Sequence, residues 1–169
     1  MMSMPPAEPV VKRTARAILL DGPHLVVIKR TRPGRAPYWI TPGGGVEPSD
    51  RSVLDALRRE VREELGAEIT NVVPAFVDTV AHTPEPGDGT PPGLKVQHFF
   101  ACRLAALDPA LRHGPEVDAP RGTYETVRLP FTPEGLTSVN LVPASLRAYL
   151  TRNVAGVLAL LAPDFAGRL

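Results

Sequence analysis

The stretch that decides the interpretation of this chain is Gly43-Gly-Gly-Val-Glu-Pro-Ser-Asp-Arg-Ser-Val-Leu-Asp-Ala-Leu-Arg-Arg-Glu-Val-Arg-Glu-Glu-Leu-Gly66. Its second half carries an apolar residue at every fourth position, which predicts a helix with one buried side. These residues are Val53, Leu57, Val61 and Leu65. Ser49 or Ser52 can cap the start of this helix, and Gly66 stands where a C-terminal cap glycine belongs.

Three glutamates lie close together on the predicted helix, on a surface different from its apolar stripe. Glu60 and Glu64 are four residues apart, and Glu63 is three residues from Glu60. Three neighbouring carboxylates repel one another, and a hard divalent cation such as Mg²⁺ removes that repulsion and also binds phosphates. The alternative is an ordinary solvated face of an α+β domain, on which glutamates and arginines form surface ion pairs.

The glycines ahead of the helix favour the first interpretation. Gly43 to Gly45 permit a close approach of the backbone to a ligand, although a glycine run by itself indicates only a tight turn. Taken together, residues 43–67 resemble the Nudix box, whose family pattern is G-x5-E-x7-R-E-U-x-E-E-x-G-U with U aliphatic. Arg59 to Gly66 matches that pattern at every fixed position. The order of elements resembles the family over roughly residues 13 to 150.

The box departs from the family pattern at two places. Asp50 is the nearest equivalent of the family's loop glutamate, while Arg51 stands where strict spacing expects that glutamate. Eight residues rather than seven separate Asp50 from Arg59, so one residue is inserted at the junction of loop and helix. Ala67 replaces the final larger aliphatic residue. We therefore expect the loop geometry to differ from the family more than the carboxylates of the helix do.

The resemblance implies a metal site and a reaction. Nudix hydrolases cleave a nucleoside diphosphate linked to another moiety by attack of water at phosphorus. By resemblance, the metal ligands are Gly44 through its carbonyl, with Gly43 as the alternative, and the carboxylates of Glu60, Glu63 and Glu64. Glu63, Glu64 and Arg59 are then the catalytic residues of the box, with Arg59 orienting a glutamate by a salt bridge. The implied cofactor is Mg²⁺, with Mn²⁺ as the alternative.

The general base is left open between two residues, because in this family it is either a glutamate of the box or one from a distant loop. Glu116 lies in the long loop over residues 108–122, and Glu125 lies at the start of the strand predicted over 124–130. For either residue, the plain alternative is a surface carboxylate without a catalytic role.

Candidate substrate-binding residues surround the glycine loop in the sequence. Arg30 and Arg32 can meet phosphates, or they can belong to a solvated basic turn. Trp39 can stack on a base, although packing is the commoner role of a tryptophan. His98 is expected to be a structural residue on the strand face opposite Gln97 and Phe99. The identity of the substrate is expected to depend on the loops over 82–93 and 108–123.

The remaining pattern predicts the fold class. A hairpin over 14–31, strands over 38–40, 69–80, 94–104 and 124–130, and a helix from Pro143 to Leu161 interleave without a repeated βα unit. This order indicates mixed α/β or α+β packing, and the family resemblance implies an α/β/α sandwich with a mixed β-sheet between helices. We expect residues 13–169 to form a single domain behind a flexible N-terminal tail, residues 1–12.

Composition limits the partners. A net charge of +1, from 19 basic and 18 acidic residues, favours neither a nucleic acid polymer nor a membrane surface as a partner, so we expect a small nucleotide-type substrate.

The single cysteine, Cys102, is expected to be a small buried hydrophobe. No secretory signal is recognisable, which favours the cytoplasm. The apolar C-terminal helix can dock on its own sheet or on a second subunit, which leaves a homodimer open. The alternative function is a catalytically weak Nudix-like module that binds nucleotide or regulates.

Overall fold

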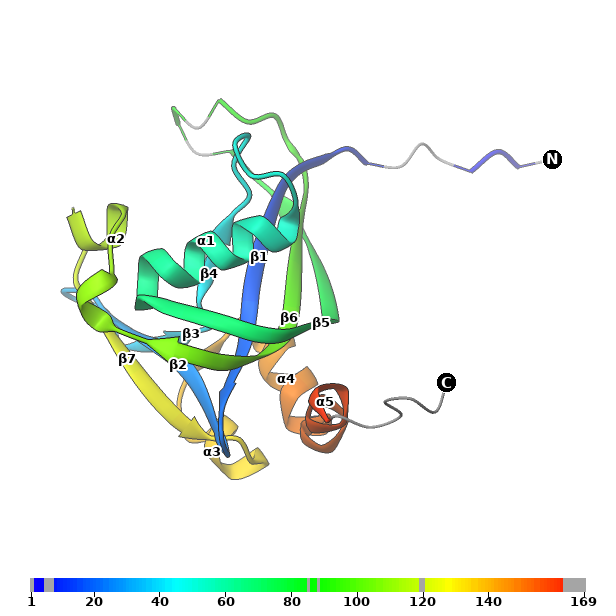
Figure 1. Ribbon diagram of the computed structural model, residues 1–169. Helices are drawn as coiled ribbons and strands as arrows, with labels where there is room; N and C mark the ends of the chain where they lie inside the picture. The colour runs from blue at the N-terminus through cyan, green and yellow to red at the C-terminus, as the bar shows by residue number, and fades with distance from the viewer. Residues whose placement is uncertain (1, 5–7, 85, 88, 119–120, 163–169) are drawn as a thin grey trace.

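The computed structural model describes residues 2–4, 8–84, 86–87, 89–118 and 121–162 (Figure 1). Its centre is one mixed sheet of eight strands in the order β5-β6-β1-β2-β3-β8, with β4 paired to β1 and β7 paired to β2. The strands are β1 (Val10–Asp21), β2 (His24–Thr31), β3 (Tyr38–Ile40), β4 (Gly43–Gly45), β5 (Ala67–His82), β6 (Gly93–Leu107), β7 (Thr123–Pro130) and β8 (Leu141–Val142). β1 runs parallel to β6 and β3 runs parallel to β8, whereas the other pairs are antiparallel.

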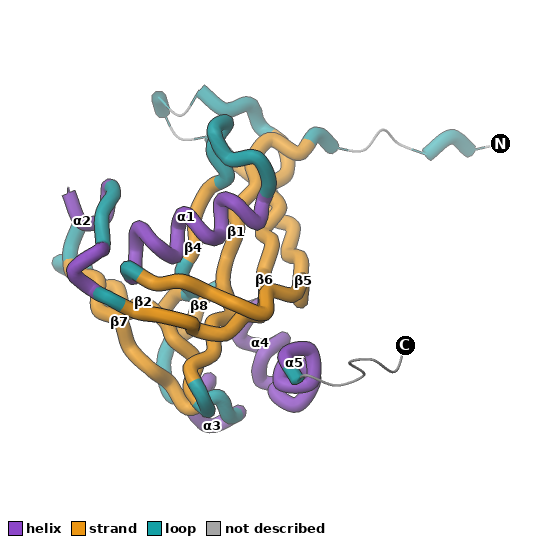
Figure 2. The backbone as a smooth tube through the Cα atoms, viewed as in Figure 1, coloured by secondary structure: helices purple, strands orange, loops and turns teal. Residues whose placement is uncertain are grey.

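The helices cover both faces of this sheet, as Figure 2 shows. They are α1 (Val53–Leu65), α2 (Pro115–Asp118), α3 (Pro133–Thr137), α4 (Ala144–Arg152) and α5 (Val154–Leu161), with a 3₁₀ turn over Pro109–Leu111. α1 lies on one face, and α3, α4 and α5 lie on the other (Figure 1). The predicted α/β/α sandwich with a mixed sheet between helices is confirmed.

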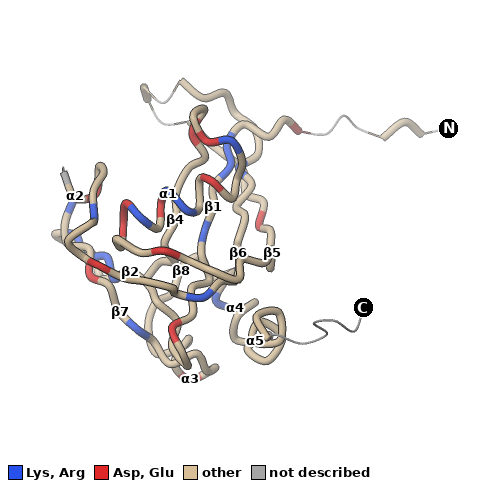
Figure 3. The backbone as a smooth tube through the Cα atoms, viewed as in Figure 1, with Lys and Arg blue, Asp and Glu red and all other residues tan. Residues whose placement is uncertain are grey.

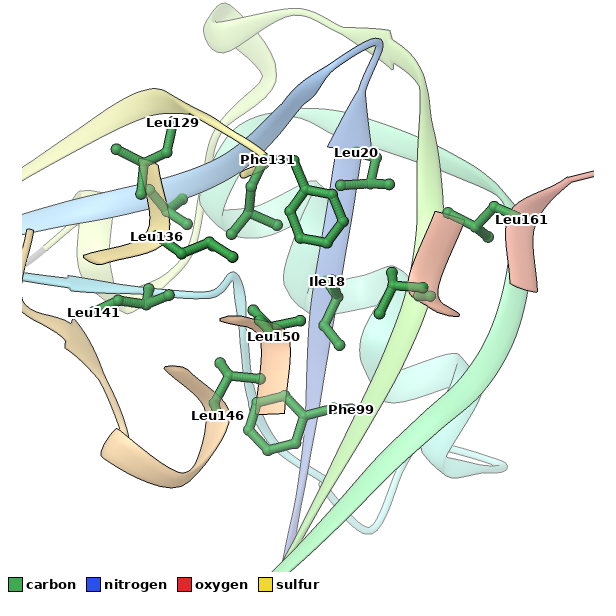
Figure 4. Close-up of a cluster of buried hydrophobic side chains, with 14 residues drawn as sticks. Ile18, Leu20, Phe99, Leu129, Phe131, Leu136, Leu141, Leu146, Leu150 and Leu161 are labelled. Atoms are coloured by element: carbon green, nitrogen blue, oxygen red, sulfur yellow. The ribbon is translucent and has the colours of Figure 1, made fainter. Parts of the chain in front are cut away.

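Alternation along the central strands gives the molecule two separate hydrophobic clusters. In β1, Ile18 and Leu20 point toward α4 and α5, while Ala17 and Leu19 point toward α1. Figure 4 shows the first cluster, in which Phe99 and residues of α3, α4 and α5 meet the sheet. Burial on both faces explains why the middle of β1 is a continuous apolar run rather than an alternating one.

α1 has the boundaries that its caps dictate. The Ser52 hydroxyl accepts a hydrogen bond from the backbone N–H of Asp55 at 3.0 Å, which selects Ser52 rather than Ser49 as the N-cap. Gly66 ends the helix in the left-handed conformation at φ 67°, and its N–H donates to the Arg62 carbonyl at 2.9 Å. The apolar stripe faces the sheet, so Glu60 and Glu64 lie along its border.

Several predicted boundaries differ from the structure. β1 begins at Val10, inside the segment expected to be a tail, because the Pro9 carbonyl accepts the N–H of Leu94 at 2.9 Å and extends the sheet. The expected C-terminal helix is two helices that meet at Asn153, whose φ of −126° and ψ of 27° are not helical. β5 shifts register between Pro74 and Phe76, because a proline cannot donate a hydrogen bond to the ladder. Across the described residues, no helix is long and apolar enough to cross a membrane.

Candidate metal and substrate site

Two glutamates of α1 are held against the glycine strand β4. Glu60 and Glu64 are each only 7% exposed, although both carry carboxylates. The N–H of Gly43 donates to Glu64 Oε2 at 3.1 Å. A Cβ at Gly44 would lie 2.5 Å from Glu60 Oε1, so the carboxylate in its present position leaves no room for a side chain there. The tight approach explains why the sequence places glycines immediately before an acidic helix.

Arg59 connects the loop to the carboxylates of the helix. Its guanidinium donates to both carboxylate oxygens of Asp50, at 3.0 and 2.9 Å, and to the carbonyl of Gly45 at 3.0 Å. It also donates to Glu60 at 3.0 Å and to Glu63 at 3.3 Å. Figure 3 shows how acidic and basic positions follow one another along α1. Arg59 therefore holds two glutamates of the box, the contact that the resemblance implied.

The extra residue between Asp50 and Arg59 lies in the turn and bend that precede α1. Asp50 reaches Arg59 because the backbone turns back at Pro48 and Ser49, where the Asp50 N–H donates to the Glu47 carbonyl at 3.0 Å. A bend over residues 51–52 then carries the chain to the first turn of α1. The Arg59 guanidinium lowers the pKa of Asp50. Asp50 thus makes the loop-to-arginine contact, and Arg51 is an exposed residue of the bend.

The two buried carboxylates are difficult to ionise. Burial, reinforced by the charge of Glu60, raises the pKa of Glu64 to about 8, against the opposing effects of Arg16 and the Gly43 N–H. Burial also raises the pKa of Glu60, and Arg59 opposes that rise. A buried pair of carboxylates that disfavours its own negative charge is stabilised when a cation binds between them.

The structure separates the two candidate bases. The segment before α2 is tied to the end of α1, since the N–H of His113 donates to the Glu63 carbonyl at 2.9 Å and Arg112 Nε donates to the Glu64 carbonyl at 2.6 Å. Glu116, on α2, therefore lies near the box, and its charge raises the pKa of both Glu60 and Glu64. Its Oε2 is buried and has no hydrogen-bond partner among the described residues.

Glu125 lies on the other face of the sheet. It pairs with Lys29 in the β2–β7 ladder, and it alternates with Tyr124, which packs on the α1 side. Val127, two residues further along β7, packs in the cluster under α3 and α4. The structure therefore brings Glu116, and not Glu125, to the glutamates of α1.

These residues fit a divalent cation in their chemistry. Mg²⁺ takes oxygen ligands, and the carboxylates of Glu60, Glu64 and Glu116 with the backbone of Gly44 supply only oxygen donors. The unpartnered Glu116 Oε2 is the kind of buried acceptor that such an ion satisfies. Among the described residues, however, no three carboxylate, histidine or cysteine side chains already converge on one point. Arg59 binds one oxygen of Glu60 and one oxygen of Glu63.

Arg30 borders a pocket beside Glu116. Its side chain is 8% exposed and packs on the Tyr124 ring, with the guanidinium carbon 3.8 Å from the ring centroid. The adjoining cavity of about 330 Å³ is lined by Pro115, Glu116, Arg121 and Tyr124. Arg30 Nη2 donates to the Arg121 carbonyl at 3.3 Å, while Arg30 Nε has no partner among the described residues. Sequence reasoning missed Arg121 and Tyr124, because only the β2–β7 pairing brings them to Arg30.

Arg32 and Trp39 have other surroundings. Arg32 is half-buried in the turn after β2, and its Nε has no partner in the described part of the chain. Trp39 packs against the cluster under α3 and α4, with the Lys29 ammonium 5.5 Å from its ring centroid. It thus lies on the face opposite α1.

His98 Nε2 is 2.9 Å from Arg13 Nη1. Cys102 is fully buried, and burial raises the pKa of its thiol to about 12.

Comparison with solved structures gives the same fold. A NUDIX hydrolase from Nitrosomonas europaea aligns with a TM-score of 0.62 at 17% identity, covering 86% of this chain and 88% of that one. The Bacillus subtilis pyrophosphohydrolase BsRppH (E68A mutant) aligns with a TM-score of 0.60 at 16% identity, covering 88% of this chain and 82% of that one. At these identities the likeness concerns the fold alone.

Comparison with curated proteins finds relatives over a shorter stretch. The nucleoside triphosphatase NudI of Escherichia coli O1:K1 is 42% identical over 64 residues, which cover 36% of this chain and 45% of that protein. The Escherichia fergusonii protein of the same name is 48% identical over 50 residues, which cover 29% of this chain and 35% of that protein. The chain therefore matches less than half the length of these relatives. The sequence model of the NUDIX domain, in contrast, matches residues 11–135, more than half of the chain, and the protein therefore belongs to the NUDIX domain family.

Proposed function

We propose that this protein is a metal-dependent hydrolase of a diphosphate linkage in a nucleoside di- or triphosphate derivative. The observation that carries the proposal is the packing of Glu60 and Glu64 against Gly43 and Gly44, with the unpartnered Glu116 Oε2 beside them. Burying carboxylates in this way costs free energy unless a cation compensates it. Membership of the NUDIX domain family and the nucleoside triphosphatase named among the relatives agree with this chemistry.

Glu60, Glu64 and the carbonyl of Gly44 would hold the cation, with Glu63 and Glu116 at its edge. When bound, Mg²⁺ or Mn²⁺ neutralises the diphosphate and acidifies water. Arg59 keeps Glu60 and Glu63 in place and ties both to the loop through Asp50. Each of these groups contributes only when it is held at the right place, so the geometry of the site depends on the packing of α1 against β4.

Glu116 is the proposed general base. Its Oε2 is buried near Glu60 and Glu64 and is free, within the described part of the chain, to accept a proton from the attacking water. A general base of this kind contributes about 10²–10⁴ in rate. Glu125, on the opposite face of the sheet, is a plain surface carboxylate in this proposal.

The cavity between Glu116 and Tyr124 is the proposed subsite for the phosphates. Arg30 and Arg121 supply two guanidinium groups next to it, and Arg30 is held rigid between the rings of Tyr38 and Tyr124. Arginine forks match phosphate oxygens, and a pre-ordered arginine loses little entropy on binding. Arg32 is a further candidate for binding the same phosphates. Trp39 is proposed to pack in the core and not to contact the substrate.

The proposal is tested with purified protein, Mg²⁺ and a panel of nucleoside di- and triphosphate derivatives, by measuring released phosphate and pyrophosphate. We expect metal-dependent turnover that falls by at least about 10²-fold in Glu64→Gln. Glu68→Gln is the matched control, because Glu68 sits next to the helix but is 57% exposed at its side chain. Absence of turnover across the panel, or equal turnover in Glu64→Gln and the wild type, contradicts the proposal.

The second candidate is a module that binds nucleotide without cleaving it efficiently. It is favoured by the absence, among the described residues, of three carboxylate, histidine or cysteine side chains that converge on one point. Calorimetry that shows nucleotide binding in Mg²⁺, together with no product in the panel, would decide for this candidate.

A location in the cytoplasm and a homodimer stay predictions. Leu158 and Leu160 of α5 are 39% and 41% exposed, which gives a second subunit an apolar surface to contact. Light scattering coupled to size-exclusion chromatography distinguishes a monomer from a dimer.

A further inference from the structure

A second cavity lies on the other side of the glycine strand from the glutamates. Its volume is about 240 Å³, and its polar lining comes from Arg16, Thr41, Lys95 and Gln97. The ends of β3 and β8 supply its apolar wall. Arg16 and Gln97 are on the sheet face that carries Ile18 and Phe99, opposite α1. The cavity is therefore distinct from the pocket between Glu116 and Tyr124.

The cavity carries an excess of positive charge. Arg16 and Lys95 line it, and Lys12 lies close enough for its charge to act on Lys95. Burial first, and then the charges of Lys12 and Arg16, lower the pKa of Lys95. Asp78 is the one carboxylate among the described residues found to oppose them, and it accepts a hydrogen bond from the Ser145 hydroxyl at 2.7 Å. Cations crowded in this way are stabilised by a bound anion.

An unpartnered hydroxyl lines the same cavity. Thr41 is 1% exposed, and its Oγ1 has no hydrogen-bond partner within the described residues. A buried hydroxyl without a partner is uncommon, because it gives up its hydrogen bonds to water. Gln97, 8% exposed, lines the cavity beside it with a side-chain amide. The lining thus combines two cationic residues, Arg16 and Lys95, with two polar residues, Thr41 and Gln97.

One residue, Gly43, makes hydrogen bonds to both sides of the glycine strand. The N–H of Gly43 donates to Glu64 Oε2 at 3.1 Å, and the carbonyl of Gly43 accepts from Arg16 Nη1 at 3.3 Å. Arg16 also donates to the Thr41 carbonyl at 3.1 Å, and its charge reaches Glu64. Gly43 therefore contacts both sites, the proposed metal site on the side of α1 and the cavity on the opposite side of the sheet.

We propose that this cavity, which we call the Lys95 pocket, binds an anionic group on the part of the substrate beyond the cleaved linkage. The group is a phosphate or a carboxylate on a moiety about the size of one sugar, because the volume is below that of a full drug-sized site. The assignment as a substrate subsite rests on the proposed hydrolysis. The preferred substrates then carry negative charge on both sides of the linkage that is cut.

Binding is tested without any cleavable linkage. Glucose, glucuronate and glucose 6-phosphate are titrated, in the absence of metal, into isotope-labelled wild-type protein, Lys95→Gln and Arg152→Gln, and followed by NMR. We expect glucuronate or glucose 6-phosphate, but not glucose, to shift the resonances of Thr41 and Gln97. We expect Lys95→Gln to weaken this binding about tenfold. Arg152→Gln removes a charge from an exposed position on α4 and should bind as the wild type does.

The two anions distinguish a carboxylate from a phosphate as the preferred group. The proposal is overturned if all three sugars act alike, or if the anions shift only resonances of Arg121 and Tyr124. It is also overturned if Lys95→Gln binds them unchanged. Circular dichroism of each variant shows whether the fold is intact, and Lys95→Arg, which keeps the charge, should restore binding.

A kinetic comparison distinguishes anion binding in the Lys95 pocket from the proposed hydrolysis of a diphosphate linkage. UDP-glucose and UDP-glucuronate differ by one carboxylate, and we expect kcat/KM to favour the charged member about tenfold in the wild type but not in Lys95→Gln. Anion binding at Thr41 and Gln97 with no cleavage of either compound or of the nucleotide panel keeps the anion site and removes the hydrolytic function. Metal-dependent cleavage without anion binding at Thr41 and Gln97 keeps the hydrolytic function and removes the anion site.

Discussion

The backbone N–H of Gly43 donates a hydrogen bond to Glu64 Oε2 at 3.1 Å, and this bond joins the glycine strand to the acidic helix. The bond lies in a site that is almost closed to solvent, where it orients Glu64 and partly offsets the rise in the pKa of Glu64 that burial causes. The carbonyl of the same residue accepts a hydrogen bond from Arg16 on the other side. Gly43 is therefore the structural link between the carboxylates and the Lys95 pocket.

Gly44→Ala should impair the site through a steric clash. The new Cβ would lie 2.5 Å from Glu60 Oε1, so the carboxylate has to move away from its present position. We expect hydrolysis to fall by at least about tenfold, because Glu60 is displaced from its position. Gly45→Ala is the matched control, since its Cβ would meet nothing nearer than Lys12 Cε at 4.0 Å. Equal activity in the two variants would show that Glu60 needs no fixed position.

Asp50→Asn should loosen Arg59. The Asp50 side chain is 6% exposed and binds Arg59 with two charge-assisted bonds, so the substitution should lower the free energy of unfolding by about 1–3 kcal/mol, measured by urea denaturation. Glu47→Gln should change it little, because Glu47 is 58% exposed and 3.6 Å from Arg59. The pKa of Asp50 is lowered in the folded protein, so its contribution is present above the unfolded pKa and is lost as the pH falls through the folded value.

Glu116→Gln should reduce kcat with little change in stability. The buried Oε2 accepts no hydrogen bond from a described residue, so loss of the negative charge breaks no contact that holds the fold. We expect kcat to fall by about 10²–10⁴, the usual contribution of a general base. Glu125→Gln should stay within about twofold of the wild type, because Glu125 lies on the opposite face of the sheet. A large fall in kcat in Glu125→Gln with little change in Glu116→Gln would instead make Glu125 the general base.

The stability of the metal-free protein should depend on pH through Glu64. Burial raises the pKa of Glu64 to about 8, so the stabilising effect of its neutral form is complete below the unfolded value near 4.5 and is lost as the pH rises to about 8. We expect Mg²⁺ to raise Tm more at pH 8.5 than at pH 5, because the cation binds the ionised carboxylate. Differential scanning fluorimetry measures both. Glu64→Gln should flatten the metal-free profile and should lose most of the Mg²⁺ effect.

Local sequence was enough to predict α1, its caps and the close approach of the glycines, because these depend on residues near one another in the chain. The spacing of Val53, Leu57, Val61 and Leu65 fixes the buried side, and the Ser52 and Gly66 caps fix the ends. Six of the eight strands were predicted for the same reason, from apolar runs separated by turn residues. The strands β4 and β8 were not predicted, because only their pairing with β1 and β3 makes these short segments strands. The break at Asn153 was missed, since the apolar pattern of residues 146–161 continues across it.

The sequence by itself determined the family, the acidic helix and the run of glycines that precedes it, whereas pairing with β1 makes these glycines the strand β4. Only the tertiary structure decided that Asp50 rather than Arg51 binds Arg59, that Glu116 rather than Glu125 joins the glutamates, and that Arg16 and Lys95 share a cavity. The reason is physical: strand register sets which face of the sheet a side chain occupies, and a shift of one residue reverses that choice. Register depends on pairings between segments far apart in the chain, which no local pattern of residues specifies.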